Sequence, residues 1–128
     1  MGIRIEVSPG ELLDKLTILE IKEQRIDDAA KLRNVSQEKS VLESARQEHI
    51  ARSADVDALT DKLRAVNERL WDIEDDIRDH ERNADFGAGF VDLARSVYRM
   101  NDERAAVKKQ INELLGSDLV EEKSYAEY

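Results

Sequence analysis

The sequence of 128 residues contains no cysteine, one proline and five glycines, and its aromatic residues are two phenylalanines, three tyrosines and one tryptophan. The absence of cysteine excludes disulfide bonds, thiolate metal ligands and cysteine nucleophiles. The scarcity of proline, glycine and aromatic residues argues against a β-sandwich or β-barrel, because such folds need many turns and strands rich in β-branched and aromatic side chains. These absences favour an all-α fold.

Long apolar runs and excess positive charge are also missing. No run of about 18 apolar residues occurs, so we expect no membrane-spanning helix. The first residues lack the apolar segment of a secretory signal, so we expect a cytoplasmic protein. The formal net charge of −9 disfavours binding to nucleic acid and to anionic membrane surfaces. Length and composition fit one soluble domain, residues 1–128, in which charged residues make up 38% of the chain.

Two uninterrupted heptad patterns dominate the second half of the chain. The first consists of Val56, Leu59, Leu63, Val66, Leu70, Ile73 and Ile77, and the second of Phe90, Leu93, Val97, Met100, Arg104, Val107, Ile111 and Leu114. Steps of three and four residues place each set on one stripe of a helix, which leaves water by packing against another helix. The intervening Phe86-Gly87-Ala88-Gly89 is suited to a change of direction. We therefore predict a long antiparallel helical hairpin, with helices over about 54–84 and 89–115.

The first half predicts two further helices. Ser8-Pro9-Gly10-Glu11 has the order of a capping box, so a helix should begin at Pro9. This helix is apolar over a wide arc, which predicts that it is the most buried one. A break at Asp27-Asp28 leads to a weakly amphipathic helix over about 29–51, which we expect on the outside. Together the four helices predict an antiparallel four-helix bundle, with Gly116 just after its last helix.

The two ends of the chain carry apolar residues outside these helices. Residues 3–7 alternate apolar and polar side chains, which predicts a short strand. An isolated strand leaves its backbone groups unpaired, and an up-down-up-down bundle brings the C-terminal tail to the same end. We therefore expect the tail, residues 119–125, to be ordered and to pair with residues 3–7, within one subunit or across a dimer.

The charged residue in the second heptad pattern, Arg104, points to a polar cluster inside the bundle. An unpaired guanidinium at a seam position costs several kcal/mol, so Glu74 or another acid beside the seam should neutralise it. Two interpretations remain open: a structural network that fixes helix pairing, or a small-molecule site between the helices. The polar residues that line this region are Asn67, Glu74, Tyr98, Asn101 and Arg104.

No metal or cofactor site is expected. Asp72, Asp75, Asp76 and Asp79 share one helix face, but that face is opposite the heptad stripe, so we interpret it as a solvated acidic face. The two histidines, His49 and His80, lack partners at metal-binding spacing. The HExxH motif, a glycine-rich phosphate loop and the GxSxG nucleophile elbow are all absent, so the sequence leans away from an enzyme.

Several blocks of the sequence together resemble a known family. The blocks are Ser8 to Lys22, Leu70 to Arg78, Phe86-Gly87, Leu93 to Tyr98, Asn101-Asp102, Gly116-Ser117 and Glu121 to Tyr125. They are similar to short bacterial and phage proteins known only as domain of unknown function 6165, over essentially the whole chain. The resemblance implies no established activity, cofactor or catalytic residue. Its blocks include polar residues that packing alone does not require, among them Lys15 and Glu20, so it implies a site or interface near the meeting point of the first helix and the tail.

Two hypotheses about function follow from the sequence. The first is a non-catalytic interaction or regulatory protein that self-associates, because one chain leaves apolar surface uncovered and such a face usually finds a symmetric partner. A homodimer is the expected form, with a small molecule or another protein as a further partner. The second is a small-molecule-binding protein or enzyme with a polar pocket between helices 1, 3 and 4. Its site adds Lys15 and Glu20 to the cluster around Arg104.

Overall fold

The computed structural model describes residues 1–128 and contains four α-helices and no strand. The helices are α1 (Pro9–Arg25), α2 (Ala29–His49), α3 (Ala54–Arg82) and α4 (Ala88–Leu114). The all-α class and the four expected helices are confirmed, with each boundary within two residues of its prediction. None of the four helices combines the length and the hydrophobicity that crossing a bilayer would require.

The helix ends follow the capping signals of the sequence. Ser8 precedes Pro9 at the start of α1, and its hydroxyl oxygen accepts a hydrogen bond of 3.2 Å from the backbone N–H of Glu11. Gly116 follows the end of α4 with a φ of +64°, the left-handed conformation that glycine adopts without strain. The capping box is only half formed, because the carboxylate of Glu11 binds Lys108 on α4 instead of turning back to Ser8.

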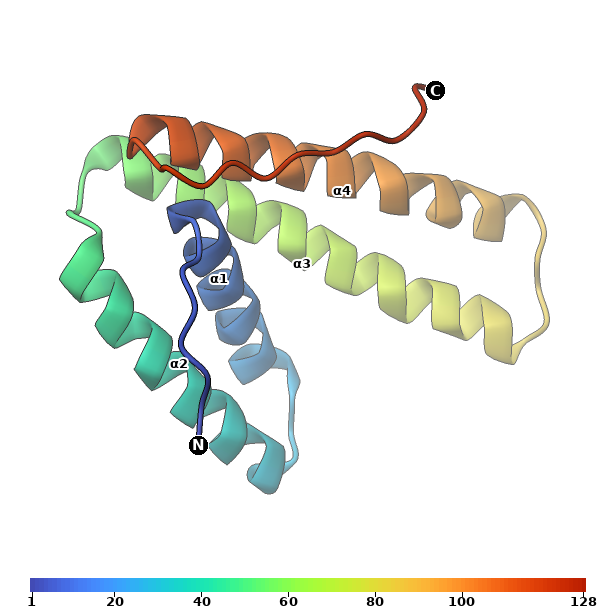
Figure 1. Ribbon diagram of the computed structural model, residues 1–128. Coiled ribbons are helices and arrows are strands. Elements are labelled where there is room, and N and C mark those ends of the chain that lie inside the picture. The colour runs from blue at the N-terminus through green and yellow to red at the C-terminus, as the bar shows by residue number, and fades with distance from the viewer.

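Helix α1 lies at the centre of the molecule. It contacts each of the other three helices, whereas α2 contacts α1 alone. Figure 1 shows two helical hairpins, α1–α2 and α3–α4, that cross obliquely instead of lying side by side along their whole length. This arrangement explains why α1 carries eight buried residues and α2 only one, Val35. The expectations of a central first helix and a peripheral second helix are both met.

The hydrophobic core occupies only part of the α3–α4 hairpin. Its central cluster joins α1, α3 and α4 and consists of Leu12, Leu13, Leu16, Ile50, Val56, Leu63, Val107 and Ile111. Between Ile73 and Val107, by contrast, no residue is buried. We call residues 74–100 the arm, because this part of the hairpin projects beyond α1 and α2 (Figure 1). The remainder of the four helices is the body.

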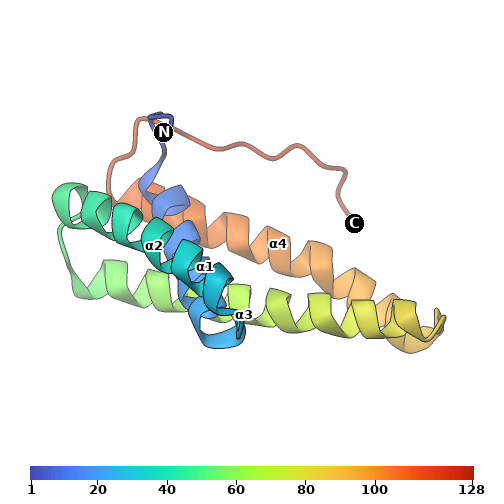
Figure 2. The ribbon, with the colours of Figure 1, turned by 90° about the horizontal axis from the view of Figure 1, so that it is seen from below.

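The predicted N-terminal strand is absent. Residues 1–7 are extended but form no backbone–backbone hydrogen bond, and the tail does not pair with them within the chain. Both terminal segments lie on one side of the molecule (Figure 2), where the tail runs back along α4 while residues 1–7 stand away from the helices. The alternation of apolar and polar side chains indicated an extended conformation correctly, but a strand also needs a partner, and one chain does not supply it.

Candidate functional site

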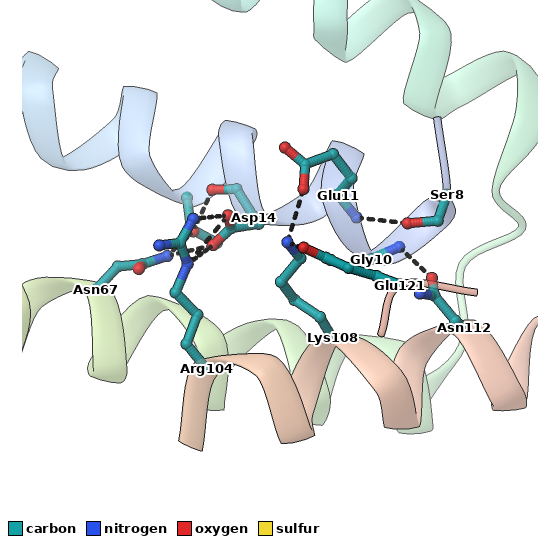
Figure 3. Close-up of polar contacts among 10 residues, drawn as sticks. Ser8, Gly10, Glu11, Asp14, Asn67, Arg104, Lys108, Asn112 and Glu121 are labelled. Carbon is teal, nitrogen blue, oxygen red and sulfur yellow. Dashed lines mark hydrogen bonds and ion pairs between the residues drawn. The ribbon is translucent and has the colours of Figure 1, made fainter. Parts of the chain in front are cut away.

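A buried carboxylate of α1, that of Asp14, organises the polar contacts between α1 and α4. The side chain of Asp14 is 1% exposed and that of Arg104 is 30% exposed. Nε of Arg104 lies 3.0 Å from Oδ1 and 3.2 Å from Oδ2 of Asp14, and Nη2 also donates to Oδ2. The hydrogen bonds to Asp14 raise the pKa of Arg104 above its ordinary value, although partial burial acts in the opposite direction. One edge of the guanidinium, formed by Nε and Nη2, is therefore bound to the carboxylate, as Figure 3 shows.

Helix α3 completes the environment of this carboxylate. The side-chain nitrogen of Asn67 donates hydrogen bonds of 2.8 Å to Oδ1 of Asp14 and 2.9 Å to the hydroxyl oxygen of Thr17. The Thr17 hydroxyl in turn donates to the backbone carbonyl of Asp14 at 2.8 Å. Asp14, Thr17 and Asn67 are all buried. This cluster joins α1, α3 and α4 without leaving a buried side-chain nitrogen or oxygen atom unsatisfied.

One turn further along α4, a buried lysine holds the start of α1 and the tail together. Nζ of Lys108 lies 2.6 Å from Oε2 of Glu11 and 2.9 Å from Oε2 of Glu121. Burial lowers the pKa of Lys108, but the hydrogen bonds to the two carboxylates outweigh it, and the pKa is raised overall. The ammonium lies at a helix N-terminus, where a positive charge is unfavourable, so the two acids are needed to stabilise it.

The backbones of α1 and α4 approach closely at Gly10. The Gly10 N–H donates a hydrogen bond of 2.7 Å to Oδ1 of Asn112, which satisfies one of the free donors at the start of α1. A Cβ atom on residue 10 would lie 2.7 Å from the carbonyl oxygen of Lys108 and 2.9 Å from Oδ1 of Asn112. Only glycine permits this packing, and the packing brings Glu11 and Asp14 within reach of the cations on α4.

The structure distributes the predicted site residues over different places. The expectation that an acid neutralises Arg104 is met, but the acid is Asp14 on α1 and not Glu74. Glu74 is exposed and pairs with Arg78 one turn along its own helix. Glu20 pairs with Arg64 at 2.8 Å, away from the cluster. Lys15 is exposed to solvent.

The other predicted residues line two open cavities beside Arg104. A cavity of about 450 Å³ between α1, α3 and α4 is bordered by Asn67, Glu74, Asn101 and Arg104. A second cavity, of about 430 Å³, lies between α4 and the tail and is bordered by Tyr98, Asn101 and Arg104. Asn101 and Arg104 therefore separate the two cavities, and the sequence-based set is divided between them.

The tail, taken from here on to the end of the chain as residues 119–128, is attached to α4 through Asp102 as well as through the ion pair between Glu121 and Lys108. The carboxylate of Asp102 accepts hydrogen bonds from the Tyr128 hydroxyl at 2.7 Å and from Nζ of Lys123 at 3.2 Å. The hydrogen bond from Tyr128 makes the larger contribution to lowering the pKa of Asp102 below its ordinary value, and the hydrogen bond from Lys123 adds to it. The ring of Tyr128 also packs against that of Tyr98, with centroids 5.1 Å apart. The contacts fold the tail over the second cavity.

The cluster is suited to holding helices together, because its charged groups are bound to one another. No three His, Asp or Glu side chains converge as metal ligands would. The carboxylate of Asp14 is occupied by Arg104 and Asn67, so it is not free to act on a substrate. Sequence reasoning missed Asp14 because it lies among the core leucines of α1. Its spacing of three and seven residues from Thr17 and Ile21 was a usable signal, since that stripe faces α3 and α4.

The comparisons with known proteins give a family and no activity. No curated protein and no solved structure matches the chain. One family model does match, over residues 3–128, and so covers both the helices that build the cluster and the tail. The protein therefore belongs to the family of unknown function DUF6165.

Proposed function

We propose that this protein is a non-catalytic interaction protein that self-associates, and that its N-terminal segment carries the contact. The observation behind the proposal is the exposure of apolar side chains outside the helices. Ile3, Ile5 and Val7 are 87%, 76% and 42% exposed, and they belong to a segment without backbone–backbone hydrogen bonds. Extended segments with free backbone groups and apolar side chains are templates for pairing with another chain.

The state of the polar cluster supports the same proposal. An enzyme of this size would be expected to keep a perturbed acid or base free in a cleft. Here Asp14 and Arg104 are bound to each other, and Lys108 is bound to two acids. The cluster is thus explained by its role in positioning α1, and the N-terminal segment is the part of the surface whose backbone and apolar side chains lack partners.

The mass of the protein in solution tests the proposal. We expect light scattering to give about twice the chain mass of 14.6 kDa across the micromolar range. Removal of residues 2–7 should give a monomer with the same helical circular dichroism, because these residues contact no helix through the backbone. A monomeric mass for the intact chain at every concentration would contradict the proposal.

A second candidate function, small-molecule binding, rests on the guanidinium of Arg104. Its Nε and Nη2 bind Asp14, and the residue borders the cavity of about 450 Å³ between α1, α3 and α4. Nη1 makes no hydrogen bond within the chain and remains available to an anionic group, with Asn101 as a neighbouring polar side chain.

A thermal-shift screen against small carboxylates and phosphates tests this alternative. A ligand at 100 times its dissociation constant should add about 2.7 kcal/mol to the free energy of unfolding. Asn101→Ala should abolish the shift without unfolding the protein, since the side chain of Asn101 borders the cavity and holds no other helix. If no compound raises the melting temperature, the cavity has no role in binding these classes of ligand.

A further inference from the structure

The N-terminal segment has a sequence that is complementary to itself. Residues 3–7 read Ile-Arg-Ile-Glu-Val, with a basic and an acidic residue placed symmetrically about Ile5. If two copies run antiparallel with Ile5 opposite Ile5, then Arg4 of each copy lies opposite Glu6 of the other. Opposite charges in directly facing positions stabilise a strand pair, and all the aliphatic side chains then lie on the other face.

The structure leaves this segment free for such pairing. It is extended, it stands away from the helices (Figure 2), and none of its N–H or C=O groups is used in a backbone–backbone hydrogen bond. We propose that residues 3–7 of two copies form an antiparallel strand pair about a two-fold axis at Ile5. This inference rests on the proposed self-association and specifies the surface and the register through which it occurs.

Charge selects the antiparallel arrangement over a parallel one. In parallel, in-register pairing, Arg4 would face Arg4 and Glu6 would face Glu6, which is destabilising. A two-fold axis also gives a closed dimer, because the same surface is used on both copies.

The tail is the other extended segment, and it is less suited as the partner strand. Residues 119–123 place Glu121 and Glu122 next to each other and so lack the alternation of residues 3–7. Glu121 is already bound to Lys108, and Lys123 is bound to Asp102. A strand formed by the tail would have to give up both ion pairs.

The paired segments also need cover for their apolar face, since an isolated two-stranded ribbon is only marginally stable. Leu119 and Val120 are 41% and 62% exposed. They follow the end of α4, which lies beside the start of α1, as the hydrogen bond between Gly10 and Asn112 shows. We expect these two aliphatic side chains of each copy to cover part of the ribbon.

Disulfide cross-linking tests the register, because the chain has no cysteine of its own. Directly opposed residues in an antiparallel pair have Cα atoms about 4.5–5.5 Å apart, within the range that a disulfide spans. Ile5→Cys should therefore give a disulfide-linked dimer under mild oxidation. Gly2→Cys is the matched control, since the two copies of residue 2 would lie roughly 20 Å apart in this register.

Cysteines at the charged positions separate the antiparallel from the parallel arrangement. Arg4→Cys and Glu6→Cys should each cross-link poorly alone, because the two copies of either residue lie roughly 8 Å apart. A mixture of the two variants should cross-link efficiently. Efficient cross-linking of Arg4→Cys with itself would overturn the antiparallel register.

Charge exchange gives a test that does not depend on oxidation. Arg4→Glu places like charges opposite each other twice per dimer, so we expect dimerisation to weaken about tenfold. The double variant Arg4→Glu/Glu6→Arg restores the pairing and should dimerise within about twofold of the original chain. No recovery in the double variant would overturn the proposed pairing.

The measurements distinguish this inference from the proposed function. A dimeric mass combined with equal cross-linking of Ile5→Cys and Gly2→Cys would overturn the strand register while self-association stands. A monomeric mass for the intact chain would overturn both. A dimeric mass with cross-linking only at position 5, and between positions 4 and 6, supports both.

Discussion

Helices α3 and α4 continue the same two heptad patterns from the body into the arm, yet their residues are buried to very different extents in the two regions. In the body, Leu63, Ile73 and Ile111 are completely inaccessible to solvent. In the arm, residues 74–100, no side chain is buried. The difference comes from α1, which covers one part of the hairpin and not the other (Figure 1). A heptad pattern thus shows which face of a helix is apolar, but not how many helices cover that face.

The sharpest test of this comparison uses two leucines that both lie on the heptad stripes of the hairpin, one in the body and one in the arm. Leu63→Ala in the body should lower the free energy of unfolding by about 4 kcal/mol, because it opens a cavity in a closed core. Leu93→Ala in the arm should cost only about 1 kcal/mol, since that side chain is half-buried already. Urea titration measures both. Similar losses for the two variants would mean that the arm is covered in solution.

Hydrogen exchange provides an independent check on the same comparison. Backbone amides of the arm should exchange faster than those of α3 and α4 in the body, because few buried contacts oppose local unfolding of the arm. If a second copy covered the arm, its protection would rise with protein concentration.

The second test compares the buried ion pair of the body with an exposed one at the base of the arm. Arg104→Met leaves the inaccessible carboxylate of Asp14 without its cation and should cost about 3 kcal/mol. Glu74→Ala removes an exposed pair with Arg78 and should cost less than about 0.5 kcal/mol. With Glu74 as the partner of Arg104, as the sequence suggested, the loss of Glu74 would be the costly change.

The two partners of the buried pair should not be equally costly to replace, and this difference serves as a control. Asp14→Asn leaves Arg104 unpaired, but Arg104 is 30% exposed and water can solvate it. We therefore expect Asp14→Asn to destabilise the protein less than Arg104→Met. Equal effects would show that the carboxylate is not the more strongly desolvated partner.

The sequence was sufficient to predict the features that depend on interactions between residues close together in the chain. The start of α1 at Pro9 and the position of Gly116 just after α4 depend on residues within one turn, and both were predicted. The need of Arg104 for an acid was also predictable, because it follows from the cost of burying a charge. These features involve no information about how helices cross.

Features that depend on the crossing of helices were not predictable. Asp14 reaches Arg104 only because the two hairpins cross obliquely and Gly10 allows a close approach. Without that angle, Glu74 on the neighbouring helix was the more obvious partner. The absence of a strand at residues 3–7 has the same origin, since the sequence showed an extended pattern but not whether another segment would lie beside it.

The third test compares two glycines that occupy the same position, the second residue of a helix. Gly10→Ala in the body places a Cβ 2.7 Å from a backbone carbonyl oxygen and should cost about 2–3 kcal/mol. Gly89→Ala in the arm places its Cβ 3.2 Å from the ring of His80, a side chain that can move. That variant should stay within about 0.5 kcal/mol of the original. Thermal unfolding of both variants checks the contrast. A large loss of stability for Gly89→Ala would show that the start of α4 is more tightly packed than its exposure indicates.

Two helix ends, one in the arm and one in the body, close with the same hydrogen-bond motif but different residues. At the end of α3, Ala84 has a φ of +50°, and its N–H donates to the carbonyl of Glu81 at 3.1 Å. At the end of α4, Gly116 has a φ of +64°, and its N–H donates to the carbonyl of Glu113 at 3.3 Å. Only the second uses the residue type that adopts this conformation without cost.

We therefore expect a small gain in stability from a glycine at the tip of the arm. Ala84→Gly removes the strain of a left-handed alanine, worth about 1–2 kcal/mol, but increases the entropy of the unfolded chain, so a net gain of about 0.5 kcal/mol is expected. Gly116→Ala introduces the same strain and should cost about 1 kcal/mol. Because the arm has few contacts with the body, slower hydrogen exchange after Ala84→Gly should be strongest in residues 74–100. An equal gain in α1 would show that arm and body unfold as one unit, and a loss of stability would show that the left-handed turn carries no strain.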